Sequence, residues 1–391
     1  MGTRLPLDEA RRLAITRCLA GEAATTVAAS LGRSRRWVYK WLARHQAGGD
    51  EWAQEVSRRP LARPRALPDR VEEAVRMVRL ELYNEGLLCG AQNIRWQLEE
   101  LELTPVPSVR TINRILARHG LTHRRTGRYE PKGKVYPALP ATQANAVHQV
   151  DYLGPCYLRG PVRFWSLNTV DVATARCATE PVPSRAGQAT VDALWATWHR
   201  LGCPAAVQAD NEWVFVGSPA HPRALGVLIR LCLPQGIEPW FIPPREPWWN
   251  GVVEKFNDHY RSKFLARVEV PSFVALGPAS RAFEAKHNSR YRYTKLGGQT
   301  PLTALQCEGQ PLRFPAQEHP PQLPLPKPEA GRYHLVRFIR SDLRLDVFGE
   351  SFKLPPEVEY EYVVATVDME PQRLRVTLGA DLIVEFPYQL R

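Results

Sequence analysis

The chain has 391 residues and a formal net charge of +12, from 52 Lys and Arg against 40 Asp and Glu. Hydrophobic residues make up 44%, an ordinary globular value, so at least one sizeable core can form. The seven cysteines are scattered and never spaced C-x2-C, which argues against a disulfide framework or a zinc site and fits a reducing cytosol. The sequence shows no secretory segment and no apolar run long enough to span a bilayer, so we expect a soluble, intracellular protein.

The basic excess is unevenly distributed along the chain. Residues 1–146 hold 25 Lys and Arg against 15 Asp and Glu, which is most of the surplus of the whole chain. A net charge of this sign indicates a polyanionic partner. A nucleic-acid contact is therefore expected first in the N-terminal third.

Residues 1–56 have the pattern of a helix-turn-helix domain. In "GEAATTVAASLGRSRRWVYKWLARHQ", Gly32 ends one apolar periodicity, Ser34 can cap the next helix, and that helix is basic. A solvated helical hairpin is the alternative reading of the same pattern. A Pro- and Arg-rich linker follows over residues 57–69. The residues expected to contact DNA lie near the start of the second helix: Arg33, Arg35, Arg36 and Lys40.

Residues 70–121 form a second helical unit that reads as another helix-turn-helix domain. Its last helix follows Ser108, a good N-cap, and carries Arg110 and Arg114 away from the apolar face. Arginines at this spacing also occur on solvated faces, so DNA contact is one of two readings. Residues 122–146 form a basic linker in which Arg124 and Arg125 are expected to follow a phosphate backbone.

From residue 147 onward the sequence pattern changes from basic helical segments to segments that include apolar strands. Residues 147–307 alternate apolar strands with amphipathic helices, which predicts an α/β domain. Residues 308–330 are a Pro-rich linker. Residues 331–391 are short alternating runs divided by Gly, Asp and Pro, which predict a small antiparallel β barrel or sandwich. The fold class is therefore multidomain, with N-terminal all-α units, a central α/β core and a C-terminal all-β domain.

Three acids stand out in the α/β region. Asp151 lies inside a strand, Asp210 ends another, and Glu254 falls in the helix after "PWWNG". A buried, unpaired carboxylate is costly, so a cation is expected nearby. Mg²⁺ prefers carboxylate oxygens, and two such ions suit displacement at a phosphodiester. Each acid alone is more often a cap or turn residue; only the constellation favours a site. Arg261 shares the helix face of Glu254, where it can hold a phosphate.

At these motifs the chain resembles the DDE transposases and retroviral-type integrases, most closely bacterial insertion-sequence transposases with an integrase-type core. The segments that carry the resemblance are "HQVDYLG", "QADNEW" and "PPREPWWNGVVEKFNDHYR". The resemblance implies a ribonuclease-H-like core in which Asp151, Asp210 and Glu254 are catalytic and bind two Mg²⁺ ions, with Mn²⁺ as a substitute. It also implies that Arg261 matches the basic residue found seven positions after the glutamate.

The chain departs from this family in two places. Glu212 stands where Asp-Asn-Gly would put a glycine, and the interval between Asp210 and Glu254 is longer than usual. Two further polar residues lie near these acids in the sequence. Asp171, which follows a strand, is interpreted as structural or substrate-positioning, and its role and that of Glu212 are left open. His148 is interpreted as a packed structural residue, because the alternation of side chains along a strand puts it on the face opposite Asp151.

By resemblance, the expected function is a DNA transposase that binds terminal inverted repeats, cuts 3′ ends and transfers strands into target DNA. Its partners would be double-stranded DNA, as transposon ends and as target, and further copies of the chain on that DNA, with no membrane. The location would be the bacterial cytoplasm, and the nucleoid when DNA is bound; the need for a helper ATPase is left open. Two alternatives are a transposase-derived DNA-binding regulator without catalysis and a ribonuclease-H-type nuclease.

Overall fold

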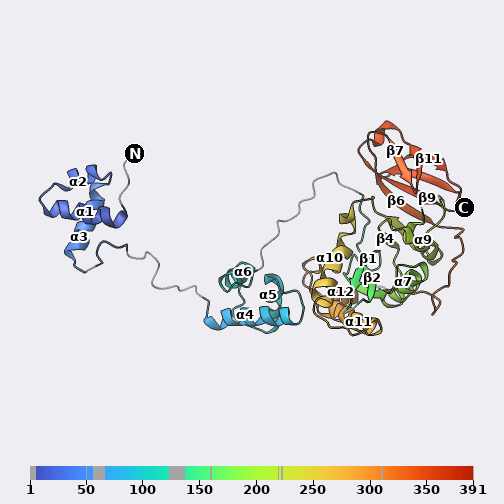
Figure 1. The fold of residues 1–391 in the computed structure, drawn as a ribbon, viewed down its shortest axis with the longest axis horizontal. Helices are drawn as coiled ribbons and strands as arrows, with labels where there is room; N and C mark the ends of the chain where they lie inside the picture. The colour runs from blue at the N-terminus through green and yellow to red at the C-terminus, as the bar shows by residue number, and fades with distance from the viewer. Residues whose placement is uncertain are drawn as a thin grey trace. The chain divides into compact units, whose positions relative to one another are not determined.

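The computed structural model divides the chain into two compact units, Met1–Leu67 and Pro68–Arg391, and each is described by itself (Figure 1). The linker arginines Arg124 and Arg125 lie outside the described residues. The structure describes residues 6–49, 51–55, 67–122, 137–158, 161–218, 220–221, 223–309 and 311–390.

The first unit is a helix-turn-helix fold, as the sequence predicts. Its helices are α1 (Leu7–Leu19), α2 (Ala24–Ser30) and α3 (Arg35–Gln46). The Ser34 hydroxyl accepts a hydrogen bond of 3.2 Å from the Trp37 backbone N–H and so caps α3.

The second unit begins with three helices, α4 (Asp69–Asn84), α5 (Ala91–Glu100) and α6 (Val109–Arg118). Ser108 caps α6 by accepting from the Thr111 N–H at 3.3 Å. The predicted apolar face of α6 is buried against the other two helices. The prediction that this segment is a helical unit is thereby confirmed.

The α/β part contains a sheet with the strand order β3-β2-β1-β4-β5. Strands β1, β2 and β3 are antiparallel neighbours, while β4 and β5 run parallel to β1. This mixed order is that of a ribonuclease-H-like core, so the predicted fold class of this region is confirmed. The strands are β1 (Val147–Tyr157), β2 (Arg163–Asp171), β3 (Cys177–Val182), β4 (Ala206–Ala209) and β5 (Glu238–Phe241).

The C-terminal strands continue this sheet, and a separate closed barrel is not confirmed. Strand β6 pairs in parallel with β5, so the described strands of the larger sheet run in the order β11-β10-β9-β6-β5-β4-β1-β2-β3. A short hairpin, β7 with β8, stands beside it. The strands are β6 (Arg332–Phe338), β7 (Arg344–Val347), β8 (Glu350–Lys353), β9 (Tyr362–Asp368), β10 (Arg373–Leu378) and β11 (Asp381–Pro387).

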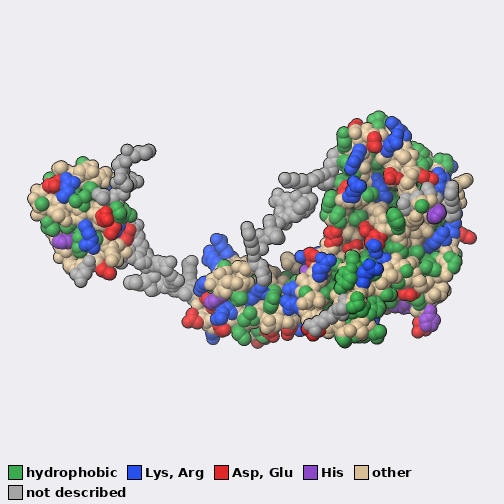
Figure 2. Space-filling view, in the orientation of Figure 1, with side chains coloured by type: hydrophobic (Ala, Val, Ile, Leu, Met, Phe, Trp, Pro, Cys, Tyr) green, Lys and Arg blue, Asp and Glu red, His purple; other side chains and the backbone are tan. Residues whose placement is uncertain are grey.

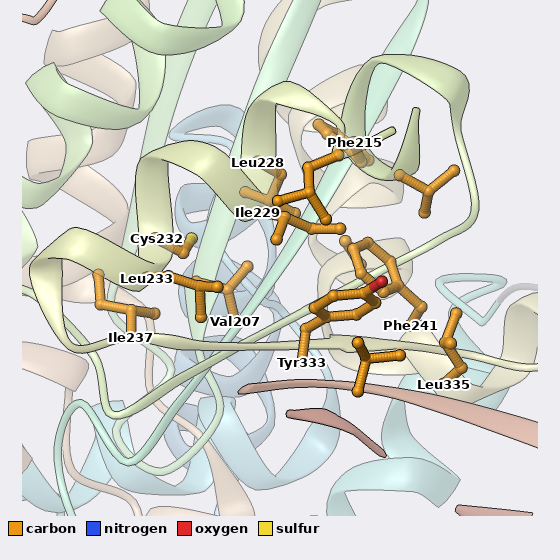
Figure 3. Packing of buried hydrophobic residues seen from close by; sticks show 14 of the residues in the cluster. Val207, Phe215, Leu228, Ile229, Cys232, Leu233, Ile237, Phe241, Tyr333 and Leu335 are labelled. Carbon is orange, nitrogen blue, oxygen red and sulfur yellow. The ribbon is translucent and has the colours of Figure 1, made fainter. Parts of the chain in front are cut away.

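Shared burial explains why the sheet is continuous. Figure 3 shows Tyr333 and Leu335 of β6 packed with Phe241 of β5 and with Leu228 and Ile229 of the helical layer. These side chains are at most 1% exposed. Separating β6 from β5 would return this apolar surface to water at roughly 25 cal/mol per Å².

The helices of this unit lie on both sides of the sheet. Val150 of β1 faces the core that contains α7 (Gly187–Leu201) and α9 (Val227–Cys232), so its neighbours Gln149 and Asp151 face the other side. There lie the 3₁₀ turn η2 (Pro247–Asn250), α10 (Gly251–His259), the π-helical segment Tyr260–Leu265 and α11 (Phe273–Arg290), followed by α12 (Pro301–Glu308). In the part of the chain that is described, no helix combines the length and apolarity needed to cross a membrane.

Candidate active site

A repeated Gln-x-Asp pattern brings the first two acids together. Gln149 of β1 and Gln208 of β4 are direct partners in the parallel pairing of these strands. Asp151 and Asp210 each follow two residues later. The same two-residue step along neighbouring parallel strands brings both carboxylates to one end and one face of the sheet.

The same glutamines fix the helix that carries Glu254. The Gln149 side-chain oxygen accepts from the backbone N–H groups of Val252 (2.9 Å) and Val253 (3.2 Å). These N–H groups belong to the first turn of α10, where backbone donors have no acceptor within the helix. The side chain of the N-cap residue Asn250 does not accept from them either. Glu254 is the next residue. Its backbone is therefore positioned by the strand that carries Asp151.

A second set of side-chain amide hydrogen bonds holds the turn η2, which precedes α10, against the sheet. Gln149 and Gln208 both donate to the Trp249 carbonyl oxygen, at 3.1 and 2.7 Å. Asn250 donates to the Val150 carbonyl oxygen at 3.1 Å. All three side chains belong to η2 or to the two strands beneath it, so the three acid-bearing segments form one hydrogen-bonded assembly.

The Asp151 carboxylate is itself oriented. Its Oδ2 accepts from the Asn257 side-chain amide at 2.7 Å, and Asn257 accepts in turn from Asn168 at 2.7 Å. Asn168, the partner of Asp151 on β2, accepts from the Ser166 hydroxyl at 2.7 Å. One oxygen of Asp151 is thereby engaged by a chain of neutral donors, which leaves the other oxygen available for a ligand.

Electrostatic repulsion shows that the acids share one region. Burial, followed by the charges of Asp210, Glu212 and Glu254, raises the pKa of Asp151 to about 7. Burial and the Glu212 charge raise the pKa of Asp210 to about 6. The pKa of Glu254 is raised by burial and then by Asp258.

The acids do not, however, close into a tight ligand cluster. Within the described ranges, no three His, Cys, Asp or Glu side chains converge closely enough to hold a metal ion. Like charges oppose closer approach. The assignment of Asp151, Asp210 and Glu254 as metal ligands therefore stays a prediction.

Glu212, the departure from Asp-Asn-Gly, has a partner of its own. It receives a hydrogen bond from Arg185 at 2.5 Å, and its backbone N–H donates to Asp210 at 3.2 Å. Arg185 also lowers the pKa of Asp210, although burial and Glu212 together outweigh it. Glu212 thus adds a fourth negative charge beside the acids while its own carboxylate is held by a cation.

Arg261 lies where the helix face predicts. It lines a hollow of about 490 Å³ together with Asp151, Glu254, Asn257 and Asp258. The Arg261 side chain is exposed, and it sits in the π-helical segment that follows α10. Segments of π-helix are frequent at functional sites. An exposed guanidinium in the same hollow as two of the acids is placed to bind a phosphate.

The two residues interpreted as structural have structural contacts. Asp171 is fully buried and accepts from the Thr174 hydroxyl and the Ala173 N–H, which closes the turn after β2. His148 is fully buried and pairs with Asn145 at 2.9 Å. Burial lowers the pKa of His148 to about 3, so it is neutral near pH 7.

The expected DNA contacts divide into three groups. Arg35 and Arg36 are exposed on α3, while Arg33 and Lys40 lie over the rings of Trp37 and Trp41, at 5.6 and 5.1 Å from the ring centroids. Arg110 and Arg114 are exposed on α6. Arg124 and Arg125 belong to the part of the chain that is not described.

Four supporting residues were not identified from the sequence: Gln149, Gln208, Asn168 and Arg337. The repeat of Gln-x-Asp at both acids could have indicated the first two. Arg337 of β6 donates to Asn211 at 3.0 Å, and Asn211 donates to the Ile242 carbonyl oxygen at 2.6 Å. No local pattern connects Arg337 to Asn211, since they are far apart in the chain.

Comparison with known proteins gives one family match and several distant structures. Residues 6–51 match the model of a homeodomain-like domain. A search of curated proteins finds no match for the chain.

Among solved structures, the chain is similar to a simian T-cell lymphotropic virus intasome. The identity is 14%, the TM-score is 0.36, and 80% of this chain and 96% of that chain are covered. The HTLV-2 integrase catalytic core domain with magnesium gives 16% identity and a TM-score of 0.33, over 42% of this chain and 99% of that chain. The BIV integrase catalytic core domain gives 18% identity and a TM-score of 0.32, over 42% of this chain and 97% of that chain. Because these TM-scores are low, the assignment of the ribonuclease-H-like fold depends on the strand order of this chain alone.

Proposed function

We propose that this chain is a DNA transposase of the DDE type, a metal-dependent polynucleotidyl transferase. The observation that carries the proposal is the paired Gln-x-Asp arrangement. In it, Asp151 lies within β1 and Asp210 directly follows the neighbouring strand β4, beneath a helix that carries Glu254 and is capped from β1. The match of residues 6–51 to a homeodomain-like domain supports nucleic acid as the binding partner.

The donor set suits Mg²⁺, with Mn²⁺ as a substitute. Carboxylate oxygens are the ligands that these ions prefer, and a dication would offset the burial and the repulsion that raise the Asp151 pKa. Asp151, Asp210 and Glu254 would hold two ions. When bound, the ions would activate an attacking oxygen and stabilise the leaving one. Asn257 keeps one Asp151 oxygen engaged, and Arg261 would bind the phosphate beside the cut.

The helical units would recognise the terminal inverted repeats. In the first unit, the residues that would contact DNA are Arg33, Arg35, Arg36 and Lys40. In the second they would be Arg110 and Arg114, with Arg124 and Arg125 of the basic linker. Cleavage would free a 3′ hydroxyl, which the same site would direct at target DNA. We propose that copies of the chain assemble on the DNA, in the cytoplasm and nucleoid of a bacterium, with or without a helper ATPase.

The test is a reaction with a labelled transposon end, target DNA and Mg²⁺. Wild-type protein should yield joined donor–target DNA, and Asp151→Asn should bind the end normally and yield none. Asp192→Asn, at an exposed acid of α7, is the matched control and should react like wild type. Joined product from Asp151→Asn would overturn the assignment. Hydrolysis without joining would identify a ribonuclease-H-type nuclease.

One observation favours a second candidate, a DNA-binding regulator that keeps the core as a scaffold. The acids do not form a closed ligand set in the described residues. Against it, a scaffold has no use for four mutually repelling carboxylates, which cost stability. End binding with no metal-dependent product under any divalent ion would select the regulator.

A further inference from the structure

A second hollow, separate from the one lined by Asp151 and Glu254, opens between the core and the C-terminal strands. It has a volume of about 590 Å³. Three segments wall it: residues 211–217, which directly follow Asp210; residues 243–246, which lead into η2 and α10; and residues 337–349 of β6, β7 and the turn between them. Two of its walls therefore continue into the segments that carry the acids.

Three of the four arginines that line this groove are free to bind a ligand, while the fourth, Arg337, is buried and hydrogen-bonded. Arg245, Arg340 and Arg344 are exposed, and none of them has an ion pair or side-chain hydrogen bond within the described part of the chain. Figure 2 shows Lys and Arg side chains over the region that Figure 1 labels β7.

Each acid of the groove already accepts hydrogen bonds. Glu246 accepts from Trp249 at 2.9 Å and from Tyr362 at 2.8 Å. Asp342 accepts from the Arg344 N–H at 3.3 Å, and Asp346 from the Gly349 N–H at 3.1 Å. These donors are neutral, so the acids keep their charge, but the groove still has four arginines against three acids. Because three of the arginines are exposed and unpaired, a ligand with several separated anionic groups fits the groove.

Trp213 adds a stacking surface. It lies three residues after Asp210, lines the groove, and is 70% exposed. The indole has no ring partner within the described residues, although most tryptophans are largely buried. Arg245 has a φ of +65°, a strained conformation for a residue with a side chain, and such strain clusters at ligand sites.

We propose that this groove binds an unpaired DNA strand that leads toward Asp151, Asp210 and Glu254. Trp213 stacks on a base, and Arg245, Arg340 and Arg344 hold successive phosphates. An aromatic platform flanked by cations is the arrangement that binds single strands without sequence preference. A duplex keeps its bases stacked on one another and offers Trp213 no face. The inference rests on the proposed function only in naming DNA as the ligand.

The experiment measures binding in EDTA, so that no strand is cut. The full chain is titrated into a fluorescent oligothymidylate and, separately, into a duplex of the same length. Trp213→Ala should weaken oligothymidylate binding by roughly 5- to 150-fold, the range for losing one stacked base. The double variant Arg340→Ala with Arg344→Ala should lower the salt slope by about 0.7 per lost phosphate contact. Neither should change duplex binding as much.

Arg375→Ala is the matched control, an exposed arginine of β10 that pairs with Glu385 and Asp368 away from the groove. It should bind both ligands like wild type. An oligothymidylate carrying 5-iodouracil should photo-crosslink at Trp213, as mapped by mass spectrometry.

Two results would overturn the inference: unchanged oligothymidylate affinity in the groove variants, or an equal loss on duplex, which would mark a duplex-binding surface. Neither touches the proposed function, because strand transfer is measured separately with Mg²⁺ and the Asp151 variant.

Discussion

Replacing Asp151 with Asn should stabilise the metal-free protein at alkaline pH. The folded Asp151 has a pKa of about 7, against 3.8 for the ordinary carboxyl. Below pH 4 the group is protonated in both the folded and the unfolded chain, so it costs nothing. Between pH 4 and 7 the unfolded chain releases the proton while the folded chain keeps it, and the wild type loses stability as pH rises. Above pH 7 the loss is complete.

The size of the effect follows from that pKa difference. At 1.36 kcal/mol for each pKa unit, the ceiling is about 4 kcal/mol. Solvent reaches part of the side chain, and relaxation relieves part of the repulsion, so we expect about 1–2 kcal/mol at pH 8. The asparagine keeps the hydrogen bond to Asn257 because its amide can present the oxygen to that donor.

The assay is urea unfolding of wild type, Asp151→Asn and Asp192→Asn in EDTA, at pH 4.5 and pH 8. The Asp151 variant should gain much more stability at pH 8 than at pH 4.5, and the exposed Asp192 control should gain none at either pH. Mg²⁺, added in place of EDTA, should then stabilise wild type by mass action and stabilise Asp151→Asn less. A variant less stable than wild type in EDTA at pH 8, or an equal Mg²⁺ response in both, would refute the electrostatic reasoning.

Three further outcomes are expected. Gln149→Leu together with Gln208→Leu should lower the strand-cleavage rate on the order of 100-fold with end binding intact, because a small displacement of Glu254 is costly; full activity would deny the amide contacts a positioning role. Glu212→Gln should shift the midpoint of Mn²⁺ binding to lower pH, since one repelling charge is lost; an unmoved midpoint would contradict this. Arg36→Ala with Lys40→Ala should reduce the salt slope of duplex binding by about 0.9 per contact, whereas an unchanged slope would place the contacts elsewhere.

Local chemistry explains what could be predicted from the sequence. Ser34 and Ser108 cap α3 and α6 because a serine hydroxyl satisfies an orphan N–H at a helix start, a relation contained in a few adjacent residues. Asp151 falls inside β1 and Glu254 inside α10 for similar reasons, since each element shows its own periodicity.

Long-range pairing explains what could not. The alternating runs of residues 331–391 fit a closed barrel and a sheet extension equally well. What decides between them is that Leu335 of β6 pairs with Phe241 of β5, a contact that spans many residues of chain. The contact of Arg337 with Asn211 has the same origin. The Gln-x-Asp repeat was visible, but its meaning depends on the parallel register of β1 with β4.

The most direct test of the central claim is a count of Mn²⁺ ions bound by the full chain, measured by electron paramagnetic resonance. At pH 8 we expect two ions for each wild-type chain and fewer for Asp151→Asn, Asp210→Asn and Glu254→Gln, with Asp192→Asn like wild type. Wild-type stoichiometry and affinity retained in all three acid variants would contradict it.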